Sequence, residues 1–373
     1  MDYLRKYIEK VIKKEEKGRL AVVVRALLFV LSVIYSQLAK LRSSLYKNNI
    51  LKKDEADIPV ISIGNITTGG TGKTPFTAFL AKRLRDDYKI AIISRGYGAS
   101  QEVEEPYLIK EGSKLRAEAA QAGDELFMLA RNNDQLIFIR SANRYWGAKL
   151  AEARGADLII LDDGFQHYQL KRNLDIVLID SESPFSNNKV LPAGLLREPF
   201  TALKRADIFL INRCENISFA ELKKLKSSLE TLSPANKGIY RSETRLDSCI
   251  SVAGQKKEKL DFLKEKKVFA FSGIGSPEAF KKSIEAAGAE VVSYQIFKDH
   301  YNYQKEDLLT MLDQYSASNA DLILTTEKDA VKLFDYETMI GDLPFYYLKI
   351  SLEIEDEQKL LKDIKREMKT EAK

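Results

Sequence analysis

The stretch "VISIGNITTGGTGKTPF", Val60–Phe76, decides the predicted fold of this 373-residue chain. It begins as a short β-branched strand, turns on glycines and ends where a helix starts, which is the order of a phosphate-binding loop. That loop is written GxxxxGK[ST]. When the pattern is aligned on Gly72–Thr74, its first glycine falls on Thr67. The strict pattern therefore fails, and the chemistry of the remaining residues has to decide whether the loop binds a nucleotide.

The chemistry of this loop is intact despite the missing glycine. Its three remaining glycines let backbone N–H groups approach phosphate oxygens, at a helix N-terminus whose dipole favours negative charge. Lys73 can bridge the outer phosphates, and the Thr74 hydroxyl can ligate Mg²⁺. A glycine-rich turn without a ligand is the alternative. The residues that we predict to hold ATP are Thr68, Gly69, Gly70, Thr71, Gly72, Lys73 and Thr74.

A pair of carboxylates supplies the partner that the metal would need. In "DLIILDDGFQH", Asp162 and Asp163 end a hydrophobic run, where a parallel sheet presents its ligand-binding edge. A carboxylate in that position holds the Mg²⁺ that bridges the β- and γ-phosphates. Capping of a helix is the alternative role for this pair.

Predicted strands alternate with predicted helices along the rest of the chain. Apolar runs predict strands at "KIAIIS", "LDIVLID" and "ADIFLIN", and Phe76–Asp87 and Ala119–Arg131 have the spacing of helices. A second series begins near Lys267 with "KVFAFSGIGSPEAF", in which Ser276 is the expected N-cap before Pro277. It continues with a helix over Gln304–Tyr315 and the strand "ADLILTT".

This alternation predicts the fold class and its divisions. The class is α/β: a P-loop NTPase-type parallel sheet flanked by helices, with a second smaller α/β domain and an N-terminal apolar helix. The predicted divisions are a charged leader and membrane-associating helix (1–50), the P-loop domain (51–235), a polar and less regular linker region (236–266) and the smaller domain (267–373).

The composition limits the classes of partner. The net charge is +5, and the basic residues form no long runs, so the chain fits an acidic or phosphorylated partner, or an anionic membrane surface, better than nucleic acid. Cys214 and Cys249 form no CxxC and have no companion histidine, which favours two reduced thiols and the cytoplasm.

An apolar segment near the N-terminus, Leu20–Ala39, has three interpretations. It just reaches the roughly 20 apolar residues that cross a bilayer, and Arg25 in its first third would be costly at depth. A cleaved signal peptide and a buried core helix are alternatives, but we favour an interfacial helix in an anionic leaflet. The leader Met1–Arg19 is expected to be a solvated helix. Cations also follow the segment, at Lys40, Arg42 and Lys47.

Together the motifs resemble the tetraacyldisaccharide 4'-kinase family of the lipid A pathway. The shared pieces run in order from residue 64 to 333: "GNITTGGTGKTP", "SRGYG", "AGDE", "ANRYWGA", "LDDGFQH", "LPAGLLREP", "FKDHYNY" and "TTEKDAVKL". The loop without its first glycine is similar to the family, and so is the N-terminal apolar helix. The charged leader before that helix is a feature that we do not associate with the family.

The resemblance implies an activity and its setting. The chain would transfer the ATP γ-phosphate, with Mg²⁺, to the 4'-hydroxyl of a tetraacylated glucosamine disaccharide 1-phosphate. It would do so at the cytoplasmic face of the bacterial inner membrane, peripheral or monotopic through its N-terminal helix. The implied partners are this glycolipid and the membrane surface, with no nucleic acid and no obligatory protein partner.

The resemblance also implies roles for single residues. Asp124, in "AGDE", would take the proton from the sugar hydroxyl, and His300 would pair with it. Lys73 would act on the transferred phosphate. Metal ligation is expected at Thr74 and Asp163, with Asp162 and Glu125 in or beside the shell. The expected contacts to substrate or phosphate are Arg95, Arg144, Gln166, His167, Arg197 and Glu198.

Other roles remain open for several of these residues. The arginines suit bidentate phosphate recognition, but each could form a surface salt bridge instead. His167 could orient Asp163 or the turn after it, and Glu198 could orient Arg197 or meet the metal. In "TTEKD", Glu327 and Asp329 are expected near the adenine or at a domain contact.

Two other functions compete with a kinase. One is a P-loop ATPase or GTPase switch acting at the membrane surface, whose loop would commonly carry Lys where this chain has Thr68. The other is a nucleotide-binding module without turnover, which is harder to reconcile with Asp124 and two motif carboxylates. ATP turnover that depends on the glycolipid would separate the three.

Overall fold

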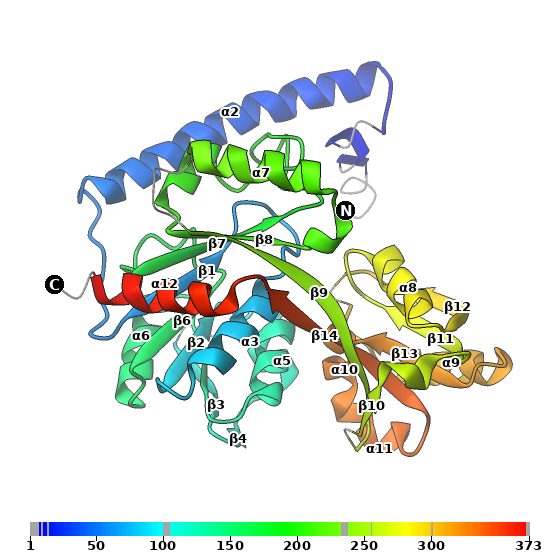
Figure 1. Ribbon diagram of the computed structural model, residues 1–373. Coiled ribbons are helices and arrows are strands. Elements are labelled where there is room, and N and C mark those ends of the chain that lie inside the picture. The colour runs from blue at the N-terminus through cyan, green and yellow to red at the C-terminus, as the bar shows by residue number, and fades with distance from the viewer. Residues whose placement is uncertain are drawn as a thin grey trace. The chain divides into compact units, whose positions relative to one another are not determined.

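The structure is a computed structural model that describes residues 7–8, 10–12, 15–99, 105–232, 238–254, 256–299 and 301–370 (Figure 1). The chain forms two compact units, each built from separate segments. The first unit takes in 1–73, 158–243 and 354–373, and the second takes in 74–157 and 244–353. The divisions predicted from the sequence remain a prediction.

The first unit is organised around a parallel sheet. Its strand order is β9–β8–β7–β1–β6, and every neighbouring pair is parallel. β1, β6 and β8 are buried along their whole length, as expected for a parallel sheet that is covered on both faces. The strands are β1 (Val60–Gly64), β6 (Leu158–Asp162), β7 (Leu174–Asp180), β8 (Ile208–Asn212) and the start of β9 (Gly238–Ser251).

Helices of the first unit come from three parts of the chain. Leu225 and Leu229 of α7 join a core cluster with Phe209 and Ile211 of β8, so an apolar stripe of that helix is buried against the sheet. The elements are α2 (Arg19–Lys47), the 3-10 turns η1 (Phe200–Arg205) and η2 (Cys214–Asn216), α7 (Phe219–Leu232) and α12 (Glu357–Thr370).

The first segment of the second unit carries strands β2 and β5, which are parallel. β5 also pairs antiparallel with β3, and β3 with β4, an antiparallel edge that the sequence patterns did not predict. The elements are α3 (Lys73–Leu84), β2 (Ile90–Ser94), β3 (Tyr107–Glu111), β4 (Lys114–Leu115), α4 (Ala119–Ala122), α5 (Asp124–Asn132), β5 (Ile137–Arg140) and α6 (Arg144–Ala153).

The other segment of the second unit carries a parallel series in the order β12–β11–β13–β14, with β10 antiparallel to β9. The elements are β10 (Lys257–Lys259), η3 (Leu260–Leu263), β11 (Lys267–Ser272), α8 (Pro277–Ala286), β12 (Glu290–Ile296), α9 (Lys305–Ala317), β13 (Leu322–Thr326), α10 (Glu327–Ala330), η4 (Val331–Tyr336), α11 (Glu337–Ile340) and β14 (Phe345–Ile354). The predicted α/β class is confirmed.

One local prediction needs correction. The helix expected over Ala119–Arg131 is broken at Gly123, which has a φ of 83°. A Cβ there would lie 2.6 Å from the Tyr97 carbonyl oxygen, so only glycine fits, and α5 starts at Asp124. The prediction of Ser276 as the N-cap of α8, with Pro277 as the first helical residue, is confirmed, although the Ser276 side chain makes no capping hydrogen bond.

Helix α2 packs on the rest of the first unit through a narrow stripe of buried side chains. Ala21 and Leu28 belong to a cluster with Val11 and Ala193, and the Ser32 hydroxyl donates to the Val190 carbonyl at 2.6 Å. Val11 is fully buried, so the described part of the leader is not simply a solvated helix.

The opposite side of α2 is apolar and exposed. Only 17% of its most apolar window is buried, whereas a core helix would be mostly buried. By length and composition this helix could cross a membrane. The exposed large apolar side chains are Leu20, Val22, Val23, Leu27, Phe29, Val30, Leu31, Val33, Ile34, Tyr35, Leu38 and Leu41.

Both cysteines are buried and unbridged, as the sequence predicted. Burial raises the pKa of Cys214 to about 11 and that of Cys249 to about 12, so neither is a reactive thiolate at neutral pH.

Candidate active site

The glycine-rich loop lies between β1 and α3, as its sequence predicts (Figure 1). Gly69 and Gly72 have φ angles of 113° and 83°, which side chains with a Cβ rarely adopt. A Cβ added at Gly69 or Gly70 would meet no atom within 4 Å. Open space therefore borders the backbone that is predicted to grip phosphates.

The Lys73 side chain is held at the end of this loop. Its Nζ donates to Asn65 Oδ1 at 3.3 Å and lies 3.5 Å from Asp163 Oδ1. Asn65 is fully buried and also donates to the Thr71 hydroxyl at 2.9 Å. The structure thus joins the loop lysine to one of the two carboxylates predicted for the metal.

Asp163 sits between two cations and has a left-handed backbone, with a φ of 54°. One Arg197 guanidinium nitrogen donates to both of its carboxylate oxygens, at 2.9 and 2.8 Å. Burial raises the pKa of Asp163, but the charges of Lys73 and Arg197 lower it more, and the net pKa lies below 3.8. Asp163 is therefore ionised throughout the neutral range. Its neighbour Asp162 is buried at the end of β6.

The Thr74 hydroxyl donates to Glu125 Oε2 at 2.8 Å. A hydroxyl and a carboxylate are the hard oxygen donors that Mg²⁺ takes, usually with several waters retained. Among the described residues, no three His, Cys, Asp or Glu side chains form a ready metal cage. The donor set therefore fits an ion that is held by few protein ligands together with phosphate oxygens.

Asp124 follows the Gly123 break and is nearly buried in the first turn of α5. Its Oδ2 lies 3.1 Å from the Nζ of Lys332, whose side chain is only 3% exposed. Lys332 also donates to the Tyr301 carbonyl at 2.9 Å and lies 3.9 Å from Asp329. The sequence analysis missed Lys332 as an individual residue, although it is the last residue but one of the quoted motif "TTEKDAVKL".

The Glu198 side chain has several hydrogen-bond partners. Its carboxylate accepts from Arg205 Nη2 at 2.8 Å and from the Tyr168 hydroxyl, and it is buried. Gln166 links the two neighbouring side chains, because its Nε2 donates to Glu198 at 3.3 Å and its Oε1 accepts from Arg197 at 3.4 Å.

The other predicted contact residues have more local surroundings. Arg144 is buried and donates to the Ser141 carbonyl at 2.5 Å, within its own turn. Arg95 is exposed, and its carbonyl accepts from Arg140 at 3.4 Å. The His167 carbonyl accepts from Arg172 at 2.5 Å. His300 lies outside the described residues.

Glu327 and Asp329 both make contacts within the second unit. Glu327 accepts from Asn132 at 2.8 Å, which joins α10 to the end of α5, and burial raises its pKa. Asp329 is fully buried and accepts from the Gly273 backbone N–H at 3.0 Å and from the Thr326 hydroxyl at 2.7 Å. The predicted position of these two residues near the adenine or at a domain contact stays a prediction.

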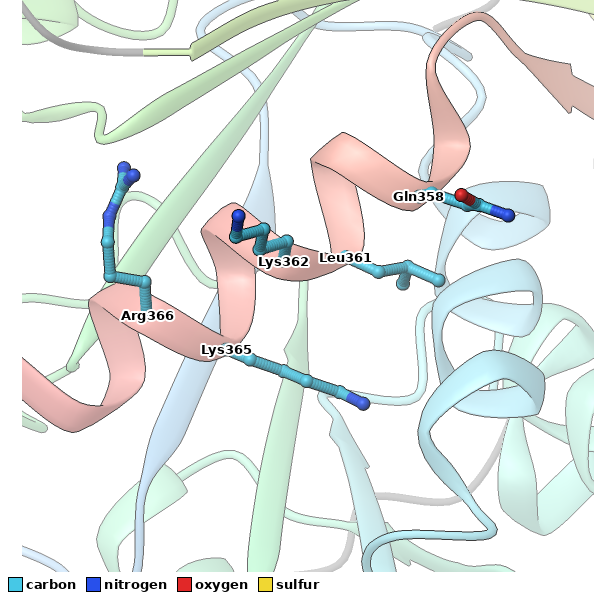
Figure 2. A pocket seen from close by; sticks show the side chains of 5 residues that line it. All are labelled: Gln358, Leu361, Lys362, Lys365 and Arg366. Carbon is cyan, nitrogen blue, oxygen red and sulfur yellow. The ribbon is translucent and has the colours of Figure 1, made fainter.

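A separate pocket runs along one face of α12 (Figure 2). None of the predicted site residues lines it. One of its cations, Arg366, is already paired with Asp363 at 2.9 Å and Glu367 at 3.0 Å. The lining residues are Gln358, Leu361, Lys362, Lys365 and Arg366.

Comparisons with known proteins agree with one another. A family model described as tetraacyldisaccharide-1-P 4'-kinase matches residues 24–369. The tetraacyldisaccharide 4'-kinase of Halothermothrix orenii is 40% identical over 341 residues, which cover 88% of each chain. That of Desulfotalea psychrophila is 39% identical over 321 residues, which cover 85% of this chain and 89% of the relative.

A solved structure matches as well. It is the crystal structure of "apo" form LpxK from Aquifex aeolicus in complex with ATP. Its TM-score is 0.75 at 30% sequence identity, and the match covers 92% of this chain and 99% of that one.

Proposed function

This chain belongs to the tetraacyldisaccharide-1-P 4'-kinase family, and we propose how its residues perform the family's reaction. The activity is ATP-dependent phosphorylation of the 4'-hydroxyl of a tetraacylated disaccharide 1-phosphate, a step of lipid A biosynthesis. The alternative of a P-loop ATPase or GTPase switch is not favoured. The observation that carries the proposal is the pair of consecutive residues Lys73 and Thr74, which contact Asp163 and Glu125 respectively.

ATP binding follows from the open backbone of the loop. The N–H groups from Thr68 to Thr74 would surround the β- and γ-phosphates at the N-terminus of α3, where the helix dipole favours anions. Lys73 would exchange its contact with Asp163 for the phosphate oxygens, since a transferring phosphoryl group offers more negative charge than one carboxylate.

Mg²⁺ belongs to the proposal rather than to what is shown. The Thr74 hydroxyl and the carboxylates of Glu125, Asp162 and Asp163 supply the hard oxygens that such an ion takes. When bound, it would neutralise charge on the β- and γ-phosphate oxygens.

Asp124 is the proposed general base for the sugar hydroxyl. The Asp124 carboxylate is buried at the start of α5, and its contact with Lys332 fixes its direction. His300 is the residue proposed to pair with Asp124. Because positioning and charge neutralisation carry most of phosphoryl transfer, the base adds to a reaction that the loop has already organised.

Lys332→Met tests whether that pairing matters. Methionine keeps the length of the side chain but loses the ammonium group, so Asp124 loses its positioning partner. A hydrogen bond to a charged group contributes about 1.5–3 kcal/mol, so we expect kcat to fall by about 10- to 100-fold. The dissociation constant for ATP, measured by calorimetry, should stay unchanged. Equal kcat values for variant and wild type would remove Lys332 from the mechanism.

The anionic acceptor calls for cations and polar groups at the site. Arg197 is the best placed of the proposed contacts, because it already holds the carboxylate next to Lys73. The same guanidinium group could bind a phosphate through two parallel hydrogen bonds. The remaining proposed contacts are Arg95, Arg144, Gln166, His167 and Glu198.

Helix α2 is the proposed route to an insoluble substrate. Its exposed leucines and valines, with Ile34, form an apolar face larger than soluble proteins usually leave uncovered, and cations flank it. We propose that this face lies in the cytoplasmic leaflet of the inner membrane, where it brings the site to the acyl chains of the glycolipid.

Membrane binding by α2 can be tested with charged substitutions. Leu27→Glu with Ile34→Glu places two charges on the exposed face and leaves the packed stripe untouched. Full burial of one such side chain is worth about 1.5–3 kcal/mol, so partitioning onto anionic vesicles should fall by about 100-fold or more. Deleting residues 1–42 should also release the chain from membranes and lower activity on dispersed lipid.

A matched pair of changes separates charge from apolar contact in that experiment. Gln37→Glu with Ser44→Glu adds the same two charges at exposed polar positions of α2. This control should co-sediment with vesicles nearly as well as the wild type. If both double variants sediment like the wild type, α2 does not contact the membrane.

The activity itself is tested by incubating radiolabelled ATP with the purified disaccharide 1-phosphate. We expect label on the 4' position and ATP consumption that depends on the acceptor. Equal ATP hydrolysis with and without the glycolipid would contradict a kinase.

A further inference from the structure

Residues at the end of β8 donate hydrogen bonds to two backbone carbonyl groups of the phosphate loop. Asn212, the last residue of β8, donates from Nδ2 to the Thr71 carbonyl at 3.1 Å. The next residue, Arg213, donates from Nη2 to the Gly70 carbonyl at 2.8 Å. Two consecutive peptide groups of the loop are thus tied to two consecutive residues that the sequence analysis did not single out.

These two donors are themselves fixed in orientation. The Asn212 amide is buried, and its Oδ1 accepts from the Ser242 hydroxyl of β9 at 3.0 Å. Arg213 has a left-handed backbone, with φ 62° and ψ 37°, and its Nη1 donates to Asp180 at 2.7 Å. Ser181 contacts the backbone of both residues. Its N–H donates to the Asn212 carbonyl at 3.0 Å, and its hydroxyl donates to the Arg213 carbonyl at 2.6 Å.

A planar trans peptide links each carbonyl to the N–H that follows it. The Gly70 carbonyl and the Thr71 N–H point in opposite directions, and so do the Thr71 carbonyl and the Gly72 N–H. Pulling both carbonyls toward β8 therefore turns both N–H groups the other way. The close approach also explains Gly72, because a Cβ there would lie 2.0 Å from Asn212 Nδ2.

We propose that Asn212 and Arg213 are positioning residues for the triphosphate: they hold the N–H groups of Thr71 and Gly72 in the orientation that grips phosphate oxygens. The inference rests on the proposed function only in taking ATP as the ligand. These two hydrogen bonds would orient the backbone of a loop that has Thr67 where the strict pattern expects its first glycine. Neither side chain needs to touch the nucleotide.

Two variants remove the two ties separately. Arg213→Met keeps the aliphatic length of a side chain that is 33% exposed, so the fold should survive. Asn212→Leu keeps the shape of the buried amide without its donor. We expect each to weaken binding of both ATP and inorganic triphosphate by about tenfold, the equivalent of one hydrogen bond. Arg213→Lys retains one donor on a flexible stem and should lose less, about threefold.

Two control variants distinguish the loss of the hydrogen bonds to the loop from the effect of a changed net charge. Arg213→Met with Asp180→Asn also removes the carboxylate charge that pairs with Arg213 in the wild type, and we expect the same loss of affinity. Arg241→Met changes a comparably exposed arginine of β9, which is paired with Glu355 and is not part of the support. It should bind ATP like the wild type. Thermal unfolding of each apo variant reports whether the fold is intact.

The outcomes are distinct. Unchanged affinity for ATP in Arg213→Met and Asn212→Leu overturns the proposal. A loss for ATP but not for triphosphate also overturns it, because it would place these residues at the nucleoside. Recovery of affinity in the Asp180→Asn double variant would assign the loss to stray charge instead. Failure of the wild type to phosphorylate the glycolipid, with ATP binding and its losses as expected, would refute the proposed function alone.

Discussion

Asp124→Ala should bind ATP nearly as well as the wild type and yet transfer phosphate about 10²–10⁴ times more slowly, the usual contribution of a positioned general base. The loop and its support lie in residues that this change leaves untouched. The measurement is kcat with the disaccharide 1-phosphate, together with the dissociation constant for ATP. Weak ATP binding with normal turnover would contradict the assigned role.

Loss of Asp124 also leaves Lys332 without its nearest carboxylate, and breaking a buried ion pair destabilises a fold. Asp124→Asn is the sharper variant, because the amide keeps the size of the side chain and can still contact neighbouring groups while it cannot act as a base. Asp86→Asn, at a side chain that is 90% exposed, serves as the control and should change neither rate nor stability. A melting curve for each variant separates lost chemistry from lost structure.

Lys73→Met should lower transfer by about 10²–10³-fold, the usual effect of removing one preorganised donor from a developing charge. Methionine fills the space of a side chain that is only 11% exposed, so the loop should keep its shape. ATP binding should weaken as well, because the same ammonium group would contact the bound phosphates. Lys82→Met, at an exposed position late in α3, is the matched control. Normal turnover in Lys73→Met would refute a phosphate role for this lysine.

The same variant has a pH signature. Lys73 and Arg197 together lower the pKa of Asp163 below 3.8, so ionised Asp163 stabilises the fold at neutral pH, and this stabilisation is lost as the pH falls through the lowered value. Without Lys73 the pKa of Asp163 should rise. The loss on acidification should then begin at a higher pH, which circular dichroism during acid titration would detect.

The sequence sufficed for the features that depend on local pattern. The strand, glycine turn and helix around Lys73 lie in one continuous stretch of sequence, so their pattern can be recognised directly. The same holds for the carboxylate pair at the end of β6. Their structural positions follow because parallel strands present their carboxyl ends at one edge. The contact between Lys73 and Asp163 was accordingly within reach of sequence reasoning.

Contacts between distant segments were not within reach. Lys332 meets Asp124 across 208 positions of sequence (332 − 124), and neither the spacing nor the composition marks that lysine among the others of the chain. Asn212 and Arg213 likewise follow an ordinary strand, and only the fold shows that the phosphate loop passes beside them. The break at Gly123 was missed because an isolated glycine in a helical pattern is compatible with a continuous helix.

The exposure of α2 is unusual for a surface helix: its buried stripe is narrow, with Ala21, Leu28 and Ser32, and most of its bulky apolar side chains are exposed. In buffer without detergent, the exposed apolar surface of α2 can contact the same surface on other copies of the chain. We therefore expect self-association of the protein that depends on its concentration and disappears in micelles. A dimer observed without detergent would then result from the absence of a bilayer and would not be the form of the enzyme at the membrane. Preparations meant for kinetics should therefore carry an amphiphile from the first step.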